Sequence, residues 1–465
     1  MIFLTPMVKV TQAEAADAVP HRGQPVAAAG MRGVGDSMKR IAFLYTDEFH
    51  WSAPYLDVAL SRLGAEITAK LFFIENERGV QDFPVEAEQL KPGMDCDQLV
   101  DKLLEWGADG VISLPMYDQE TMRDAVVKDH LADRGIPMIM HRPEVIRMFS
   151  SKWDTKEVVR RFGIEASDGI LIDGDLLNGR GPAVYGYPAY VRRRALELGF
   201  PLLVKPLWDC GANGICFIEN ELALINYLQE PYDGNAVLEQ CLEGELCSVE
   251  IVGHDGSYII QPLIWKGKTG SAPPFMASDR FRYCIPRREA DDTFAPIAAR
   301  LRTMCTTLGV EGVIEVEMIY VENTYRVIEI NPRLSGTTTL SIAASDCDTY
   351  GCLVAMLLGN WTEEYARSGE RRMRSAFQFP VLRLTDELVY ALELDFGLVR
   401  TRSFTFRGRE FHDVVVTCEF TETALLKSKL ASLQSRFNLL TRALAAEADG
   451  VITSSLTELP LFDVR

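Results

Sequence analysis

The chain has 465 residues, of which 25% are charged and 47% apolar, and its formal net charge is −18. This composition is typical of a soluble globular protein with about two to four domains. The acidic balance argues against a protein that coats nucleic acid, because such a surface would be basic. No apolar run approaches the length of a membrane span, so a membrane protein is not expected.

The N-terminal segment is rich in Ala, Gly, Gln and Pro, and we expect residues 1–38 to be disordered. It lacks the basic leader of a secretory signal. The ten cysteines show neither the Cys-x-x-Cys spacing of a zinc site nor the frame of a small secreted protein. These features predict reduced thiols and a cytoplasmic location.

A first domain is predicted over residues 39–149, where short apolar runs alternate with helical stretches. The expected strands are 41–45, 69–74, 111–115 and 137–140, and the expected helices are 52–63 and 96–106. Alternating helices and continuously apolar strands predict a parallel α/β layer. No Gly-x-Gly-x-x-Gly turn is present, so the domain is not assigned a dinucleotide.

The remainder is predicted to be of α+β class, with one domain over residues 150–362 and a small accessory domain over residues 363–465. A helix at 151–163 carries Lys152 and ends at a glycine, and a strand at 201–206 carries Lys205. Further helices are expected at 220–228, 295–308 and 346–358, further strands at 215–218, 237–242, 247–252 and 256–264, and a long loop at 271–289.

The most informative segment is 313–336, in which two apolar strands are joined by a polar turn at residues 322–324. Glu317 lies in the first strand and Glu329 in the second, with Asn331 two residues later on the same face. Two buried carboxylates close together require a cation, and three oxygen ligands suit Mg²⁺. The alternative is a solvated hairpin whose carboxylates face water.

The order of these features resembles the ATP-grasp superfamily, which includes D-alanine–D-alanine ligase, biotin carboxylase, carbamoyl phosphate synthetase and L-amino acid ligases. The resemblance covers about residues 40–360. It rests on the lysine-bearing helix, the strand–lysine–glycine loop, a Glu-x-x-x-Glu-Gly-Glu segment and a final Glu-x-Asn-Pro-Arg. Its most specific part is the spacing of twelve positions between Glu317 and Glu329, with Asn331 and Arg333 in register.

The resemblance implies an ATP-grasp fold of two α+β subdomains that binds ATP. Glu317, Glu329 and Asn331 would hold Mg²⁺, or Mn²⁺ in its place, at the ATP phosphates. Arg333 would be a catalytic residue that faces the charge developing on the acyl group, because a fixed guanidinium suits that task. The alternative for Arg333 is a salt bridge to a structural carboxylate.

Lys152 and Lys205 match the two family lysines that grip the phosphates, and Lys205 is also expected to be catalytic. A lone lysine in a buried strand is costly without a ligand, which strengthens the prediction that Lys205 binds phosphate. The alternatives are an edge-strand position for Lys205 and a solvated helix face for Lys152. Gly211 and Gly214 match the glycine-rich flap, in which backbone N–H groups approach a phosphate, although this loop has fewer glycines than biotin carboxylase.

The segment 239–242 resembles the hinge that receives adenine, with Glu239 accepting from the adenine amino group. The hinge residues are Glu239, Gln240, Cys241 and Leu242. Glu245 resembles the acid that binds the ribose hydroxyls, although the family's Gly-x-Glu register would place Leu246 there instead.

Basic residues of the later loops are candidates for recognising a substrate carboxylate. Lys266 or Lys268 could reach it or the α-phosphate, and solvated positions explain both equally well. The same alternatives hold for four arginines of the long loop, which are Arg280, Arg282, Arg287 and Arg288.

The resemblance implies an ATP-dependent carboxylate–amine ligase that forms an amide or peptide bond through an acyl-phosphate and releases ADP and phosphate. Its partners would be a small-molecule carboxylate and an amine, such as amino acids or small peptides. The alternatives are a carboxylase, a carboxylate kinase and a non-catalytic ATP-binding regulatory protein. Residues 363–465 could complete the acceptor pocket or mediate a homodimer.

Overall fold

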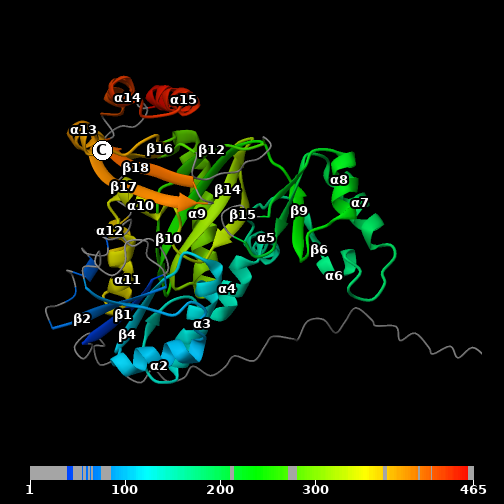
Figure 1. Ribbon diagram of the computed structural model, residues 1–465, viewed down its shortest axis with the longest axis horizontal. Coiled ribbons are helices and arrows are strands. Elements are labelled where there is room, and N and C mark those ends of the chain that lie inside the picture. Colours follow the sequence, from blue (N-terminus) through cyan, green and yellow to red (C-terminus); the bar gives the residue numbers. More distant parts are fainter. Residues whose placement is uncertain are drawn as a thin grey trace, which may run out of the picture.

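The structure is a computed structural model (Figure 1). It describes residues 39–45, 55, 59–60, 63, 66–74, 85–209, 214–270, 280–369, 374–406, 409–419 and 422–458. The segment 1–38, Gly211 and most of the predicted helix 52–63 lie outside these ranges. Within them, no helix combines the length and the apolar composition that a membrane crossing requires.

The first sheet is parallel throughout, in the order β3-β2-β1-β4-β5. Every residue of β1 after Arg40 is buried, as expected for a parallel strand covered on both faces. The strands are β1 (Arg40–Tyr45), β2 (Thr68–Phe73), β3 (Glu86–Gln89), β4 (Gly110–Leu114) and β5 (Met138–Ile139). The helices are α2 (Cys96–Trp106), α3 (Asp118–Ala132) and α4 (Pro143–Ser150).

Helix α2 ends where its sequence predicts. The Asp95 side chain accepts from the Gln98 amide in a capping box, and Gly107 closes the helix at φ 77°. That conformation favours glycine because it carries no Cβ. The predicted parallel layer is confirmed, although helix α3 was not predicted.

The second sheet is antiparallel, in the order β6-β9-β7-β8, and has its own apolar core (Figure 1, right). Its strands are β6 (Gly169–Ile172), β7 (Leu202–Pro206), β8 (Cys216–Ile218) and β9 (Ala236–Gln240). Helix α5 (Lys152–Arg161) precedes it, and helices α6 (Gly174–Leu177), α7 (Tyr187–Leu198) and α8 (Glu221–Gln229) accompany it.

The third sheet has nine strands, in the order β15-β14-β10-β12-β13-β16-β18-β17 with β11 beside β10. Strand β16 pairs with β13, so the sheet continues across the predicted boundary between residues 362 and 363. The domain boundaries stay a prediction. The strands are β10 (Glu245–His254), β11 (Ser257–Ile260), β12 (Ile264–Lys268), β13 (Arg282–Cys284), β14 (Gly312–Val321), β15 (Thr324–Asn331), β16 (Ser375–Val381), β17 (Gly397–Phe406) and β18 (Arg409–Cys418).

Helices cover the third sheet, and α14 and α15 lie beyond its C-terminal strands (Figure 1). Every residue of α11 is buried, so the amphipathic helix predicted at 346–358 is instead shorter and enclosed on all sides. It shares an apolar core with β1 of the first sheet and Val252 of β10, which joins the two sheets. The helices are α9 (Arg288–Leu308), α10 (Thr338–Ser345), α11 (Thr349–Leu357), α12 (Glu363–Gly369), α13 (Asp386–Asp395), α14 (Thr423–Phe437) and α15 (Arg442–Glu458). The predicted combination of α/β and α+β layers is confirmed.

His141 links the first sheet to β14 as a neutral ring. Its Nε2 lies 2.9 Å from the Val313 carbonyl, and its Nδ1 accepts from the Glu311 amide at 3.2 Å. Burial lowers the pKa of His141 from 6.5 to about 4. The folded protein therefore favours the neutral ring, and this contribution to stability is present above pH 6.5 and lost as pH falls toward 4.

We expect His141→Gln to remove this pH dependence. The difference in free energy of unfolding between the wild type and the variant should shrink by about 1.4 kcal/mol per pH unit from pH 6.5 to 4. Urea unfolding over this range measures it. Burial raises the pKa of Glu250 to about 7, so its contribution to stability changes with pH in the opposite direction to that of His141. This contribution is the same in both proteins and cancels from the difference in free energy of unfolding. A difference that does not change with pH would contradict the prediction.

Candidate active site

Strands β14 and β15 form the predicted hairpin, which is closed by Glu322 and Asn323 at φ 50° and 57°. Two central residues with positive φ make the turn that matches the twist of antiparallel strands. Glu317 pairs directly with Glu329 across the hairpin. The hairpin therefore brings these carboxylates together, and their role as metal ligands stays a prediction.

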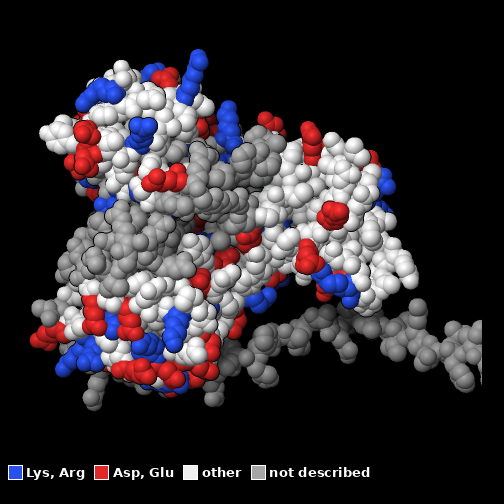
Figure 2. Space-filling view, in the orientation of Figure 1, with Lys and Arg blue, Asp and Glu red and all other residues white. Residues whose placement is uncertain are grey.

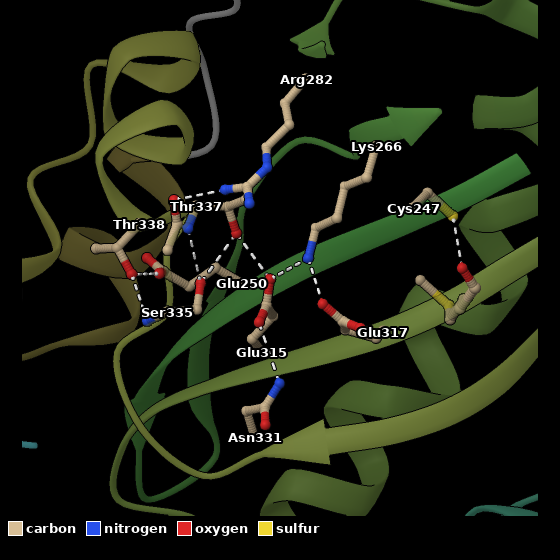
Figure 3. Close-up of polar contacts among 12 residues, drawn as sticks. Cys247, Glu250, Lys266, Arg282, Glu315, Glu317, Asn331, Ser335, Thr337 and Thr338 are labelled. Atoms are coloured by element: carbon tan, nitrogen blue, oxygen red, sulfur yellow. Dashed lines mark hydrogen bonds and ion pairs between the residues drawn. The ribbon is translucent and has the colours of Figure 1, made fainter. Parts of the chain in front are cut away.

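Lys266, from β12, lies between two carboxylates of β14 (Figure 3). Its Nζ is 2.7 Å from Glu315 Oε1 and 2.5 Å from Glu317 Oε1. Burial lowers the pKa of Lys266, but the two carboxylates outweigh burial and raise it above its ordinary value. The sequence did not distinguish Lys266 from Lys268. Lys268 is exposed, so only Lys266 joins this group.

Glu315 fixes the orientation of the Asn331 amide. It accepts from Asn331 Nδ2 at 3.2 Å and from Thr337 Oγ1 at 2.7 Å (Figure 3). The Asn331 amide oxygen therefore points away from Glu315 and accepts a hydrogen bond from Arg333 Nη2 at 3.1 Å. The sequence analysis did not single out Glu315, although its position two residues before Glu317, on the same strand face, was an available indication.

Arg333 lies between the hairpin and the first sheet. Its Nε donates to Asp118 Oδ1 at 3.0 Å, and Asp118 is the first residue of α3. The salt bridge considered as an alternative for Arg333 therefore exists, with a carboxylate from a distant part of the chain. Because the guanidinium also bonds Asn331, it belongs to the hairpin site, and its catalytic role stays a prediction.

Two buried lysines approach Glu329. Lys152 Nζ lies 3.4 Å from Glu329 Oε2 and donates to the Asp209 carbonyl at 2.7 Å. Lys205 Nζ lies 2.7 Å from Glu239 Oε1. Burial lowers the pKa of Lys205, but Glu239 and then Glu329 raise it above its ordinary value. The structure thus brings both predicted phosphate-binding lysines to the hairpin.

Glu239 is enclosed by basic side chains instead of facing an open hinge. Its Oε2 lies 2.5 Å from Lys156 Nζ and accepts from Ser167 Oγ at 3.1 Å. Burial raises the pKa of Glu239, but Lys156 and Lys205 outweigh it and lower the pKa to about 2. Burial lowers the pKa of Lys156, which is completely enclosed. The sequence analysis missed Lys156, which lies one helical turn after Lys152.

The predicted adenine hinge, 239–242, comprises the last two residues of β9 and the two that follow. The amides of Gln240 and Cys241 donate to the carbonyls of Asp168 and Pro201, each at 3.0 Å. The Leu242 carbonyl also accepts from a hydroxyl, that of Thr269, at 2.7 Å. These backbone groups are bonded within the protein in this structure. Adenine binding by the hinge stays a prediction.

Glu245 is not brought to the carboxylate–lysine group. It lies three residues before Ser248, which pairs with Glu317, so Glu245 faces the opposite side of the sheet. There both carboxylate oxygens accept from Arg287 at 2.9 Å, and the Arg287 guanidinium lies 4.0 Å from the Trp265 ring centre. Ribose binding by Glu245 stays a prediction.

Gly214 ends the predicted flap in a conformation that favours glycine. Its φ is 68°, and a Cβ there would lie 2.9 Å from Pro206 Cγ. A side chain would be strained and would collide with the strand that carries Lys205. The other flap glycine, Gly211, lies outside the described residues.

The proposed metal ligands fit a magnesium ion by their donor types, which are two carboxylates and an amide oxygen. Burial raises the pKa of Glu317, assisted by Glu315 and Glu329 and opposed by Lys266. The neighbouring carboxylates thus disfavour a negative charge on Glu317, and a cation bound there would favour it. No group of three or more His, Cys, Asp or Glu side chains in the described ranges could hold a metal. The proposed ligands Glu317, Glu329 and Asn331 include only two carboxylates, so oxygens of the ATP phosphates would have to complete the coordination of the ion.

Residues 183–337, which include Lys205, Glu239 and the whole hairpin, match the ATP-grasp domain family. The chain carries an ATP-grasp domain. The resemblance predicted from the sequence is confirmed for this domain.

Relatives of known identity agree with this domain. Carbamoyl-phosphate synthase of Methanobrevibacter smithii is 23% identical over 287 residues, which are 60% of this chain and 72% of the relative. Several carbamoyl phosphate synthase large chains also match, and this chain spans only 14–19% of their length.

Solved structures share the fold over most of the chain. L-amino acid ligase from Bacillus licheniformis is 16% identical with a TM-score of 0.63, and the match covers 85% of this chain and 97% of that one. The biotin carboxylase domain of Hydrogenobacter thermophilus 2-oxoglutarate carboxylase is also 16% identical, with a TM-score of 0.62 and coverage of 85% and 90%. At this identity the likeness concerns the fold alone.

Proposed function

We propose that this ATP-grasp protein is an ATP-dependent carboxylate–amine ligase that forms an amide or peptide bond through an acyl-phosphate. One observation carries the proposal. Lys152 lies 3.4 Å from Glu329, which pairs with Glu317 across the hairpin, and Lys152, Lys205 and Arg333 outweigh burial and lower the pKa of the Glu329 carboxyl. Cations for phosphates, oxygens for a metal and a fixed guanidinium are what phosphoryl transfer to a carboxylate needs.

In the first step, a carboxylate oxygen of one substrate attacks the γ-phosphorus of ATP, and the bond to the β–γ bridging oxygen breaks to release ADP. Lys152 and Lys205 would bind phosphate oxygens. Glu317, Glu329 and Asn331 would hold Mg²⁺, which when bound neutralises phosphate charge. The product is an acyl-phosphate.

In the second step, the amine nitrogen attacks the acyl carbon and loses a proton, and the carbon–oxygen bond to phosphate breaks. The tetrahedral adduct carries an oxyanion before it collapses. Arg333 would stabilise that charge. Because Asp118 and Asn331 hold its guanidinium, little reorganisation is needed during the reaction.

The surface and thiols support small-molecule partners and a cytoplasmic location as parts of this proposal. On the face shown in Figure 2, the coloured Lys and Arg side chains lie among Asp and Glu rather than in a continuous basic surface. The nine cysteines within the described ranges are free thiols. The homodimer stays a prediction.

The proposal is tested by ADP release from MgATP across a panel of amino acids and dipeptides, with mass spectrometry of the products. We expect ADP only when a carboxylate and an amine are both present, together with an amide product. Dependence on bicarbonate would favour a carboxylase instead. An acyl-phosphate trapped by hydroxylamine, with no amide from any amine, would favour a carboxylate kinase. Tight ATP binding without turnover would favour a regulatory protein.

A further inference from the structure

Lys266 reaches the hairpin from two strands away. In the third sheet, β10 lies between β12, which carries Lys266, and β14, which carries Glu315 and Glu317. Neighbouring strands are about 4.8 Å apart, so β12 and β14 are separated by about 10 Å. The residue of β10 that pairs directly with Glu317 is Ser248, which is small and buried. A short side chain at this position leaves room for the long stem of the lysine.

Glu315 anchors the ammonium of Lys266. It accepts from Lys266 Nζ at 2.7 Å, from Thr337 Oγ1 at 2.7 Å and from Asn331 Nδ2 at 3.2 Å (Figure 3). These donors come from β12, from the segment just before α10 and from β15. Because three donors from separate elements hold this buried carboxylate, we infer that Glu315 serves the protein's own side chains and is not a metal ligand.

Both carboxylates of the proposed metal site have a lysine partner when no metal is present. Lys266 Nζ lies 2.5 Å from Glu317 Oε1, and Lys152 Nζ lies 3.4 Å from Glu329 Oε2. Removing the cation from a buried ion pair is strongly destabilising, because the carboxylate left behind is uncompensated. These lysines therefore allow the hairpin to stay folded without a metal, and the closer contact is the one at Glu317.

A metal ion on Glu317 would compete with Lys266. Magnesium binds carboxylate oxygens at about 2.0–2.1 Å, so an ion on the same oxygen would lie less than about 5 Å from the ammonium. Two cations at that separation repel one another strongly in a buried site. The ammonium therefore has to move off Glu317 when the metal binds, while Glu315 can retain it.

We propose that Lys266 is a positioning residue that occupies the place of the metal at Glu317 while nucleotide is absent, so that Mg²⁺ enters the site together with ATP. This inference rests on the metal-binding role of Glu317 in the proposed function. The ATP phosphates bring further oxygen ligands and negative charge, which compensate for moving the ammonium. Without them, a metal ion gains only an incomplete ligand set and loses the ion pair between Lys266 and Glu317.

The test measures metal binding without nucleotide. The probe is Mn²⁺ alone, and electron paramagnetic resonance counts the free aqueous ion during titration of the full chain. Lys266→Met removes the ammonium and keeps a long, flexible side chain. We expect the dissociation constant for Mn²⁺ to fall about tenfold or more relative to the wild type, because the ion no longer displaces a buried cation.

Lys268→Met is the matched control, because it removes an exposed cation two residues farther along β12. It should change the dissociation constant for Mn²⁺ by less than about twofold. Adding Glu317→Gln to Lys266→Met should return the dissociation constant to the wild-type value or above it, which would place the ion on Glu317. If Lys266→Met does not fold, Lys266→Gln replaces it, because the amide can still donate to Glu315.

Thermal unfolding gives a second readout that does not depend on turnover. A ligand that binds the folded state alone raises the midpoint of unfolding. Excess Mg²⁺ without nucleotide should therefore raise the midpoint of Lys266→Met and leave that of the wild type and of Lys268→Met close to unchanged.

Equal Mn²⁺ affinity of the wild type and Lys266→Met would overturn the inference. Tighter binding that persists after Glu317 is also replaced would overturn it as well, because the ion would then lie elsewhere. The titration uses no substrate, so it decides the inference whether or not ADP is released. A failure of the ligase function would appear in the substrate panel alone.

Discussion

Replacing Glu329 by Gln is expected to lower the rate of ADP release on the order of a thousandfold. The change keeps the shape of the side chain but removes the carboxylate that lies opposite Glu317 and 3.4 Å from Lys152. The fold should persist, because Lys152 retains the Asp209 carbonyl and Lys205 retains Glu239. Steady-state ADP release and thermal unfolding of the same preparation measure both effects.

Glu165→Gln is the matched control for this prediction. Glu165 is an exposed carboxylate next to β15, 3.7 Å from Arg326, so its loss removes a charge near the hairpin but outside the site. We expect close to wild-type turnover from it. Turnover of Glu329→Gln within about tenfold of the control would rule out Glu329 as an essential metal ligand.

Replacing Glu239 by Gln is expected to destabilise the protein by about 3–5 kcal/mol. Its carboxylate is the shared partner of Lys156 and Lys205, and the neutral amide would leave two buried cations close together without an anion. The measurement is the free energy of unfolding in urea at pH 7. ATP binding should weaken as well, because Lys205 would lose its position in the site.

The matched control is Glu221→Gln, which breaks the exposed ion pair with Arg192 on the same domain. An exposed pair contributes about 0–1 kcal/mol, so this variant should stay near wild type. Similar losses from Glu239→Gln and Glu221→Gln would show that the buried pairing with Lys156 and Lys205 does not hold this sheet together.

Residues in an unusual local setting could be predicted from the sequence. Lys205, Glu317 and Glu329 stand out because each is a charged residue within an apolar strand, and such a residue needs a partner or a ligand. The continuously apolar runs of the first sheet predicted its parallel strands for a related reason, since only strands covered on both faces lack polar alternation.

Residues in an ordinary local setting were missed. Lys156 lies one turn after Lys152 on a helix with charged neighbours, where most lysines are solvated. Glu315 resembles any carboxylate of a half-exposed strand until Lys266 is placed against it. Helix α10 was not predicted either, and all eight of its residues are buried.

The sequence by itself predicted the ATP-grasp resemblance, through the spacing of Glu317, Glu329 and Asn331 and the lysine-bearing strand before them. Local chemistry suffices there, because a strand alternates with period two whatever surrounds it. Only the tertiary structure decided which strand lies beside which. The pairing of β16 with β13 joins residues far apart in the chain, and no local pattern encodes such a non-local choice. Only the tertiary structure likewise places Lys266 of β12 against Glu315 and Glu317.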